Sequence, residues 1–125
     1  MNFFEQLFFH KEITDTADGF VAKLQCNPAH PVYQAHFLGN PITPGACLLM
    51  MAGKILEQKL KKPLLLQSSK NIKFLNVLIP AEGKAFEYRF SNLAETDSGF
   101  KVQVVIADEA VVYSKMSLTY SYATL

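Results

Sequence analysis

The stretch Thr43–Pro63, "TPGACLLMMAGKILEQKLKKP", predicts one long helix around which the rest of the chain is organised. Threonine is a good N-cap residue, and Pro44 suits the first helical position, where its missing N–H costs nothing. No further proline occurs before Pro63, so the helix is expected over about residues 44–61. Because its first half is apolar all round, we expect the helix to be buried on every side.

Short strands are predicted on both sides of this helix. Upstream, residues 8–25, "FFHKEITDTADGFVAKLQ", indicate two strands around a turn at 15–19. Residues 27–44 contain four prolines, which favours a structured loop without a regular helix. Downstream, apolar residues alternate with period two in four segments: "NIKFLNVLI" (71–79), 86–90, 102–106 and "VVYSKMSLTYSY" (111–122). The pattern predicts an α+β fold, with an antiparallel sheet of about six strands wrapped around the helix in a single domain, 1–125.

Composition excludes several classes of function. Half of the 125 residues are hydrophobic, 18% are charged and the net charge is +1, which argues against a nucleic-acid binder. No apolar run approaches the ~18–20 residues of a membrane span, and the N-terminus lacks the features of a signal peptide. Cys26 and Cys47 have no CxxC spacing and suit a reducing cytoplasm. No glycine-rich phosphate loop or metal-ligand set is present, so no cofactor is implied.

The segment "HFLGNPITPG" (36–45), which leads into the helix, resembles the signature of the hotdog-fold 3-hydroxyacyl-(acyl-carrier-protein) dehydratases, H-F-P-G-[DN]-P-x-x-P-G. Seven of the eight fixed positions are kept, and Leu38 replaces a proline. The segment "KFLNVLIPAEG" (73–83) is similar to a second family stretch. The resemblance covers roughly Cys26 to Tyr122, whereas the family's N-terminal H-R-x-P-x-L-x-x-D-R segment is absent.

The resemblance implies a role for each matching residue. His36 would be the base that removes the proton beside the thioester carbonyl, since histidine accepts protons near neutral pH. The backbone N–H of Gly45, at the positive end of the helix dipole, would stabilise the developing enolate oxygen. The other predicted substrate-binding residues are Phe37, Pro44, Ala46, Leu49 and Met50. The implied partners are an acyl carrier protein carrying the acyl thioester and a second hotdog subunit, because the family's sites form between subunits.

The catalytic carboxylate of the family is missing. The family places a glutamate or aspartate fourteen residues after the histidine, where it faces the histidine of the other subunit, and here that position is Met50. A thioether is useless for proton transfer. Glu57 lies two turns further along, ~10 Å away. Cys47 shares a helix face with Met50, but a thiol in apolar surroundings has a raised pKa.

Three interpretations follow. The first is a dehydratase subunit that forms trans-2-enoyl thioesters in fatty-acid or polyketide/polyene synthesis, either as a homodimer or as a heterodimer whose related partner supplies the carboxylate. The second is a non-catalytic hotdog protein that binds an acyl chain or acts as a scaffold. The third is an acyl thioesterase. His30 is expected to cap or pack in the loop. A group of lysines is either a solvated face or, by the resemblance, a carrier-protein dock: Lys59, Lys61, Lys62, Lys70 and Lys73.

Overall fold

The computed structural model describes residues 6–35, 39 and 41–123. Its elements follow one another as strands β1 (Phe8–Thr16) and β2 (Gly19–Cys26), helices α1 (Pro31–Ala35) and α2 (Gly45–Leu60), and strands β3 (Leu64–Phe74), β4 (Ala85–Glu95), β5 (Gly99–Ala107) and β6 (Val112–Tyr122). The predicted six-stranded sheet and the long helix are confirmed.

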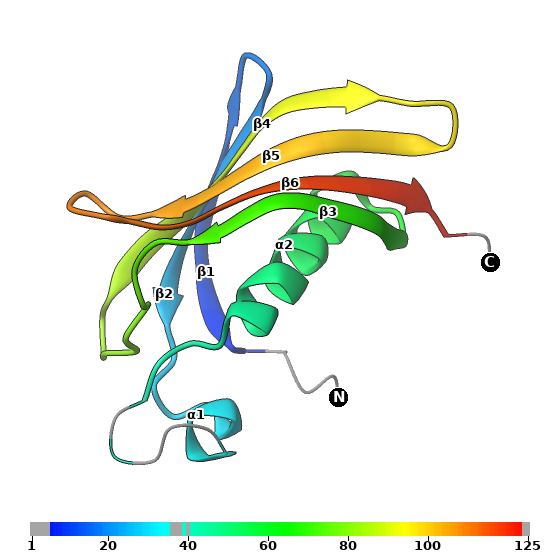
Figure 1. The fold of residues 1–125 in the computed structure, drawn as a ribbon. Coiled ribbons are helices and arrows are strands. Elements are labelled where there is room, and N and C mark those ends of the chain that lie inside the picture. Colours follow the sequence, from blue (N-terminus) through cyan, green and yellow to red (C-terminus); the bar gives the residue numbers. More distant parts are fainter. Residues whose placement is uncertain (1–5, 36–38, 40, 124–125) are drawn as a thin grey trace.

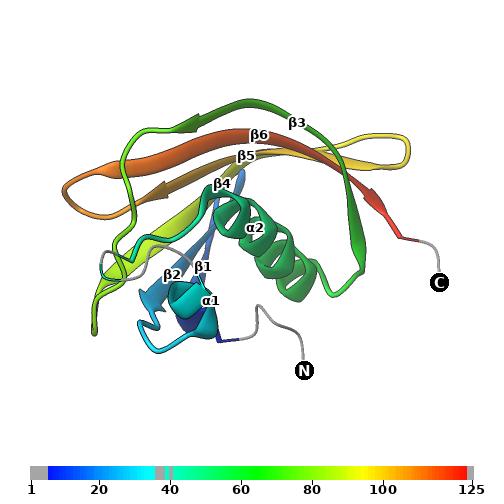
Figure 2. The same cartoon turned by 60° about the horizontal axis from the view of Figure 1, so that its bottom comes forward.

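The six strands form one antiparallel sheet in the order β1-β2-β4-β5-β6-β3. The sheet curves around α2, which crosses its concave face (Figures 1 and 2). Although β3 precedes β4 in the chain, it pairs only with β6. It therefore forms one edge of the sheet, and its position places it beside α2 (Figure 2).

Helix α2 is buried on one face only, so the expectation of burial on every side is wrong. Ala46 and Met50 are exposed, Met50 by 45%. They continue into Gly53 and Glu57 at helical spacing and so form a second stripe, over which the described residues place no covering layer. The buried face packs against the sheet, each large apolar side chain contributing ~1.5–3 kcal/mol, and consists of Cys47, Leu48, Met51, Ala52, Ile55 and Leu56.

The start of α2 differs from the predicted capping. The helix begins at Gly45, and Pro44 is the N-cap, with extended backbone and no side-chain cap. Thr43 is buried and its hydroxyl shares a 2.9 Å hydrogen bond with the Tyr33 hydroxyl, while its N–H donates to the Leu78 carbonyl. Its hydroxyl is therefore committed to a tertiary partner, a competition that local capping preference cannot reveal.

The proline-rich segment 27–44 contains a helix after all, contrary to the prediction. Helix α1 is a short turn whose first residue is Pro31, the position at which proline is tolerated. His30, which is buried, caps this turn by accepting the Val32 N–H at its Nδ1 atom over 3.0 Å, so its predicted capping role is confirmed. Neither described helix has the length and hydropathy needed to cross a bilayer.

The first strand after α2 begins earlier than predicted. It runs from Leu64 to Phe74 rather than over 71–79, and the N–H groups of Leu75 and Asn76 both donate to the Tyr113 carbonyl. Nearly all of β3 is exposed, so it lacks the apolar–polar alternation by which half-buried strands are recognised. It is a strand because it pairs with β6, whose partner residues lie at least 40 positions away in sequence (Phe74 opposite Ser114).

Candidate active site at the start of α2

The predicted base lies outside the described residues, and so do Phe37 and Leu38. The description of the loop resumes at Gly39, whose φ of 80° lies in the left-handed region that favours glycine. It continues through the half-buried Pro41 to the N-terminus of α2. His36 is thus bracketed by α1, which ends at Ala35, and by this turn.

The first turn of α2 offers unused hydrogen-bond donors. The N–H groups of Cys47 and Leu48 donate to the Pro44 carbonyl, at 3.0 and 3.2 Å. Those of Gly45 and Ala46 have no acceptor among the described residues. Free N–H groups at a helix N-terminus, reinforced by the helix dipole, suit an anion or a polarised carbonyl oxygen. The geometry expected of an oxyanion donor is therefore available at Gly45.

Phe74 is a site residue that the sequence reasoning missed. A Cβ atom on Gly45 would lie 2.7 Å from the ring Cζ of Phe74, so the ring packs against the start of α2 and would have to shift to admit a side chain there. Phe74 is the last residue of β3 and is 56% exposed. The sequence signal was its place in "KFLNVLIPAEG", but the contact with Gly45 depends on β3 lying beside α2.

A groove of about 230 Å³ runs between α2 and β3. Two of the predicted substrate-binding residues, Leu49 and Met50, line it together, whereas Pro44 and Ala46 lie at the helix start. The remaining lining residues come from both elements and from β6, and are Gly53, Lys54, Glu57, Leu64, Leu66 and Tyr120. The open stripe of α2 is thus one wall of a mostly apolar groove that leads away from Met50.

Neither Glu57 nor Cys47, the two titratable residues considered on the Met50 side of α2, can take the place of the carboxylate that the resemblance leads us to expect. Glu57 accepts the Leu64 N–H at Oε2 over 2.9 Å, and its other oxygen lies 3.9 Å from the Lys54 amine, so its carboxylate holds the start of β3 against α2. Cys47 is buried, and burial raises the pKa of its thiol. A thiol that stays protonated is a poor base.

Tyr120 is a second site residue that the sequence reasoning missed, and it places a polar group in the groove. Its side chain is only 3% exposed, yet its hydroxyl has no hydrogen-bond partner among the described residues and is not fully enclosed. Burial is the main cause that raises the pKa of this hydroxyl, and the nearby Glu57 carboxylate raises it further. The hydroxyl therefore remains protonated and can donate a hydrogen bond. A Cβ on Gly53 would lie 3.5 Å from it. Sequence reasoning could not find Tyr120, which β6 brings to α2 from the far end of the chain.

Buried tyrosines hold α2 in place against the sheet. The Tyr88 hydroxyl donates to the Leu48 carbonyl over 2.8 Å, and Tyr33 bonds Thr43 immediately before the helix. Burial raises the pKa of Tyr33 to about 12 and that of Tyr88 well above its ordinary value. Both hydroxyls therefore stay protonated and serve to position the helix start.

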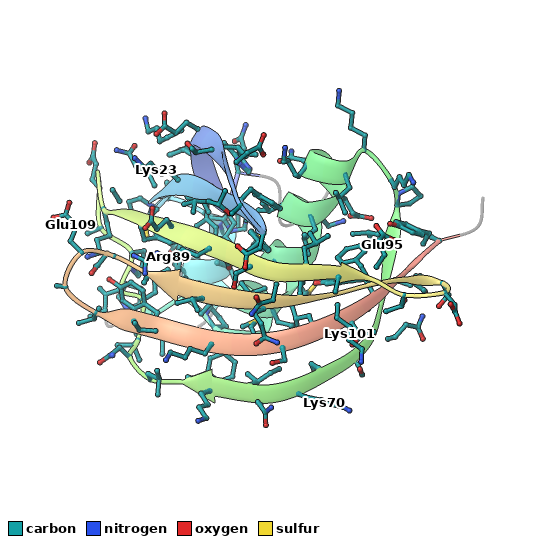
Figure 3. The ribbon with its side chains drawn as sticks, turned by 90° about the horizontal axis from the view of Figure 1, so that it is seen from above. Lys23, Lys70, Arg89, Glu95, Lys101 and Glu109 are labelled. Atoms are coloured by element: carbon teal, nitrogen blue, oxygen red, sulfur yellow. The ribbon has the colours of Figure 1, made fainter. Side chains whose placement is uncertain are left out.

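A larger hollow, about 910 Å³, lies elsewhere and contains none of the predicted site residues. Figure 3 shows Lys23, Arg89 and Glu109 around it on the outer face of the sheet. Most of its charged side chains are already paired: Arg89 donates to Glu87 over 2.8 Å, Lys84 bonds Asp108, and Lys23 lies 3.1 Å from Glu12 outside the hollow. We therefore place the candidate site at α2. Within the described chain no group of three His, Cys, Asp or Glu side chains is placed to hold a metal ion.

Comparison with known families yields one match covering most of the chain. The model of the ApeI-like family, described as ApeI dehydratase, matches residues 12–116. This range includes the loop 36–45, α2 and β3 to β5. No functionally curated protein matches the sequence at a significant level.

Solved structures share the architecture. The dehydratase heterocomplex ApeI:P from Xenorhabdus doucetiae contains a chain with a TM-score of 0.70 and 15% identity, covering 91% of this chain and 97% of that one. A putative thioesterase from Lactococcus lactis has a TM-score of 0.67 and 18% identity, covering 98% of both chains. A hypothetical thioesterase from Streptococcus pneumoniae, solved with coenzyme A, has a TM-score of 0.66 and 13% identity, covering 95% and 90%. At these identities the likeness establishes the fold alone, which is the hotdog fold.

Proposed function

Because this chain belongs to the ApeI-like dehydratase family, we propose that it is a subunit of a (3R)-3-hydroxyacyl-(acyl-carrier-protein) dehydratase. The reaction would convert 3-hydroxyacyl thioesters to trans-2-enoyl thioesters in fatty-acid or polyketide/polyene synthesis. The observation that carries the proposal is the pair of free N–H groups of Gly45 and Ala46 beside a groove that begins at Met50. A thioester oxygen at the helix start would leave its acyl chain directed along this groove.

The proposed chemistry needs three groups. His36 would take the C2 proton, and the C2–H electron pair would pass into the enolate, whose oxygen the Gly45 N–H stabilises. The C3–O bond then breaks as an acid protonates the departing hydroxyl, so that water leaves and the C2–C3 double bond forms. Gly45 is present and its N–H has no acceptor among the described residues, and His36 stands at the matching position of the loop. The third group, the acid, has no candidate around Met50 within the part of the chain that the structure describes.

A second hotdog chain would supply that acid. The chain similar to this one in Xenorhabdus doucetiae belongs to a dehydratase heterocomplex, and by analogy we infer that this chain also assembles with a related subunit. The open stripe of α2 and the free edge of β3 leave Met50 accessible to a partner, since Met50 is 45% exposed. A glutamate or aspartate on the partner's helix would then face His36.

Reconstitution tests the proposal. Each hotdog chain encoded near this one is purified alone and after co-expression with it, and is given a 3-hydroxyacyl carrier-protein thioester. We expect the ultraviolet absorbance of the enoyl thioester to appear with the mixed complex at ~10²–10⁴ times the rate of this chain alone, the usual value of one acid–base group. Complexes that form but show no gain over either chain would overturn the proposal.

Gly53 should control how long an acyl chain the groove accepts. An alanine fits there, since its Cβ would contact the Tyr120 hydroxyl at an ordinary 3.5 Å, whereas a leucine would fill the groove. We expect Gly53→Leu to raise KM at least ~10-fold for long acyl chains and to leave four-carbon substrates nearly unchanged, because each methylene kept in water forfeits ~0.8 kcal/mol. Gly53→Ala is the matched control. Equal effects on short and long substrates would remove this groove from the acyl site.

The same assay separates the alternatives. A thioesterase is favoured by the resemblance to two thioesterase structures, and would release a free thiol and an acid without enoyl absorbance. A non-catalytic acyl-binding or scaffold subunit would show neither product, and its own His36 would be dispensable for the activity of its partner.

A further inference from the structure

The outer edge of β3 is unpaired and partly apolar. The strand is the last in the sheet and makes its ladder to β6 alone. Leu65 and Leu66 near its start are 54% and 42% exposed, and Phe74 at its end is 56% exposed. Free backbone donors and acceptors beside exposed apolar side chains favour the addition of another strand.

The sequence that leads into this edge and through it is basic, although Lys59, on α2, is paired with Asp15. Residues 58–81 contain five of the twelve basic residues and none of the eleven acidic ones. Lys70 and Lys73 lie on β3 itself, are exposed, and form no ion pair with any described residue. Lys73 pairs across the ladder with Lys115 of β6, which adds to the positive charge. Figure 3 shows Lys70 at this edge of the sheet.

From this arrangement we propose that β3 pairs, edge to edge, with an acidic strand of a second hotdog chain and discriminates against a second copy of itself. The inference rests on the partnership in the proposed function and names the chemistry by which the partner is chosen. Carboxylates opposite Lys70 and Lys73 would be attracted to them and would neutralise the charge of the edge.

Self-pairing would bring like charges together in two of the registers open to the strand. Centred at Ser69, the middle of β3, an antiparallel two-fold pair places the two Lys70 residues two positions apart. Shifted towards Phe74, it places Lys70 directly opposite Lys73 of the other copy. Each such pair lowers the association constant by a factor of about 1.5 to 5.

Mixing the chain with a charge-reversed form of itself tests the proposal without knowledge of the natural partner. Wild type and the double variant Lys70→Glu/Lys73→Glu, distinguished by isotope labelling, are combined and analysed by native mass spectrometry. We expect mixed dimers to exceed the statistical proportion, with the ratio of the squared mixed-dimer signal to the product of the two homodimer signals raised at least ~10-fold. Added salt should reduce this excess, because it screens exposed charges.

The control is Lys11→Glu/Lys101→Glu, which reverses two exposed charges away from β3 and should mix statistically. Circular dichroism establishes that each variant is folded. If the variant does not fold, the test is the self-association constant of the wild-type chain. This constant should rise with salt if like charges oppose self-pairing. A statistical mixture at low salt, monomers only, or a wild-type constant that stays level or falls with salt would overturn the proposal.

Two further outcomes separate this proposal from others. If the double variant loses binding to an acidic carrier protein while mixing statistically with wild type, the lysines serve the carrier and the edge proposal is wrong. The native mass spectra report which chains assemble and do not report catalysis. An inert mixed complex would therefore overturn the dehydratase proposal alone, and a statistical mixture would overturn the edge proposal alone.

Discussion

Replacing Met50 with glutamate is expected to raise the dehydration rate of this chain by a factor of ~10²–10⁴ when two copies assemble. The substitution puts a carboxyl group where the family resemblance expects one, fourteen residues after His36. In a symmetric dimer each copy would then carry both a base and an acid. The gain is large because a missing acid–base group, rather than poor binding, is what we infer limits the reaction.

The structure makes this substitution practical. Met50 is 45% exposed, so a glutamate there avoids the cost of burying a charge in the core. The free energy of unfolding should change by only ~0.5 kcal/mol, as is usual for surface positions. Met50→Gln, similar in shape but unable to transfer a proton, is the matched control.

The measurement is the rate of enoyl formation by the purified variant. Thermal unfolding and the oligomeric state are measured on the same samples. A rise with glutamate and none with glutamine supports acid–base chemistry at position 50. A folded, dimeric Met50→Glu protein that stays inert on 3-hydroxyacyl carrier substrates would mean that the site has diverged at more than this residue.

The second large effect is expected at His36. Changing it to alanine in the active assembly, either the heterocomplex or the Met50→Glu dimer, should lower kcat by ~10²–10⁴ and leave KM within a few-fold. We expect kcat to fall and KM to change little because the imidazole removes a proton in the transition state and contributes little to holding the acyl chain. Steady-state kinetics of enoyl formation measures both constants.

His10→Ala is the control for this experiment, since His10 is exposed on β1, away from the α2 groove. His30 would be a poor choice, because it is buried and caps α1, so its loss would perturb the loop itself. If His36→Ala retains full activity in a complex that dehydrates its substrate, the partner alone carries the chemistry. The scaffold interpretation would then replace ours.

The sequence could predict those parts of the molecule that depend on neighbouring residues. The long helix predicted between Pro44 and Pro63, over about 44–61, ends within one residue of the observed bounds. The first hairpin turn lies within the predicted range 15–19 but is shorter, because residues 15–16 belong to β1 and Gly19 begins β2. The loop motif placed Gly45 at the start of that helix, and the spacing of the resembling family predicts a carboxylate at the position that Met50 occupies. These features are local, because helical period, proline geometry and motif spacing depend only on residues close together in the sequence.

Tertiary structure alone decided which surfaces are left open. Periodicity could not show that β3 is an edge strand, that one stripe of α2 lacks a covering layer, or that Phe74 meets Gly45 and Tyr120 faces Gly53. Each of these depends on the order of strands in the sheet, which brings together residues far apart in the chain. By itself, therefore, the sequence determined a helix and a sheet and predicted a catalytic histidine that needs an acid from elsewhere, whereas the sheet order decided which edge strand and which stripe of α2 lie open among the described residues.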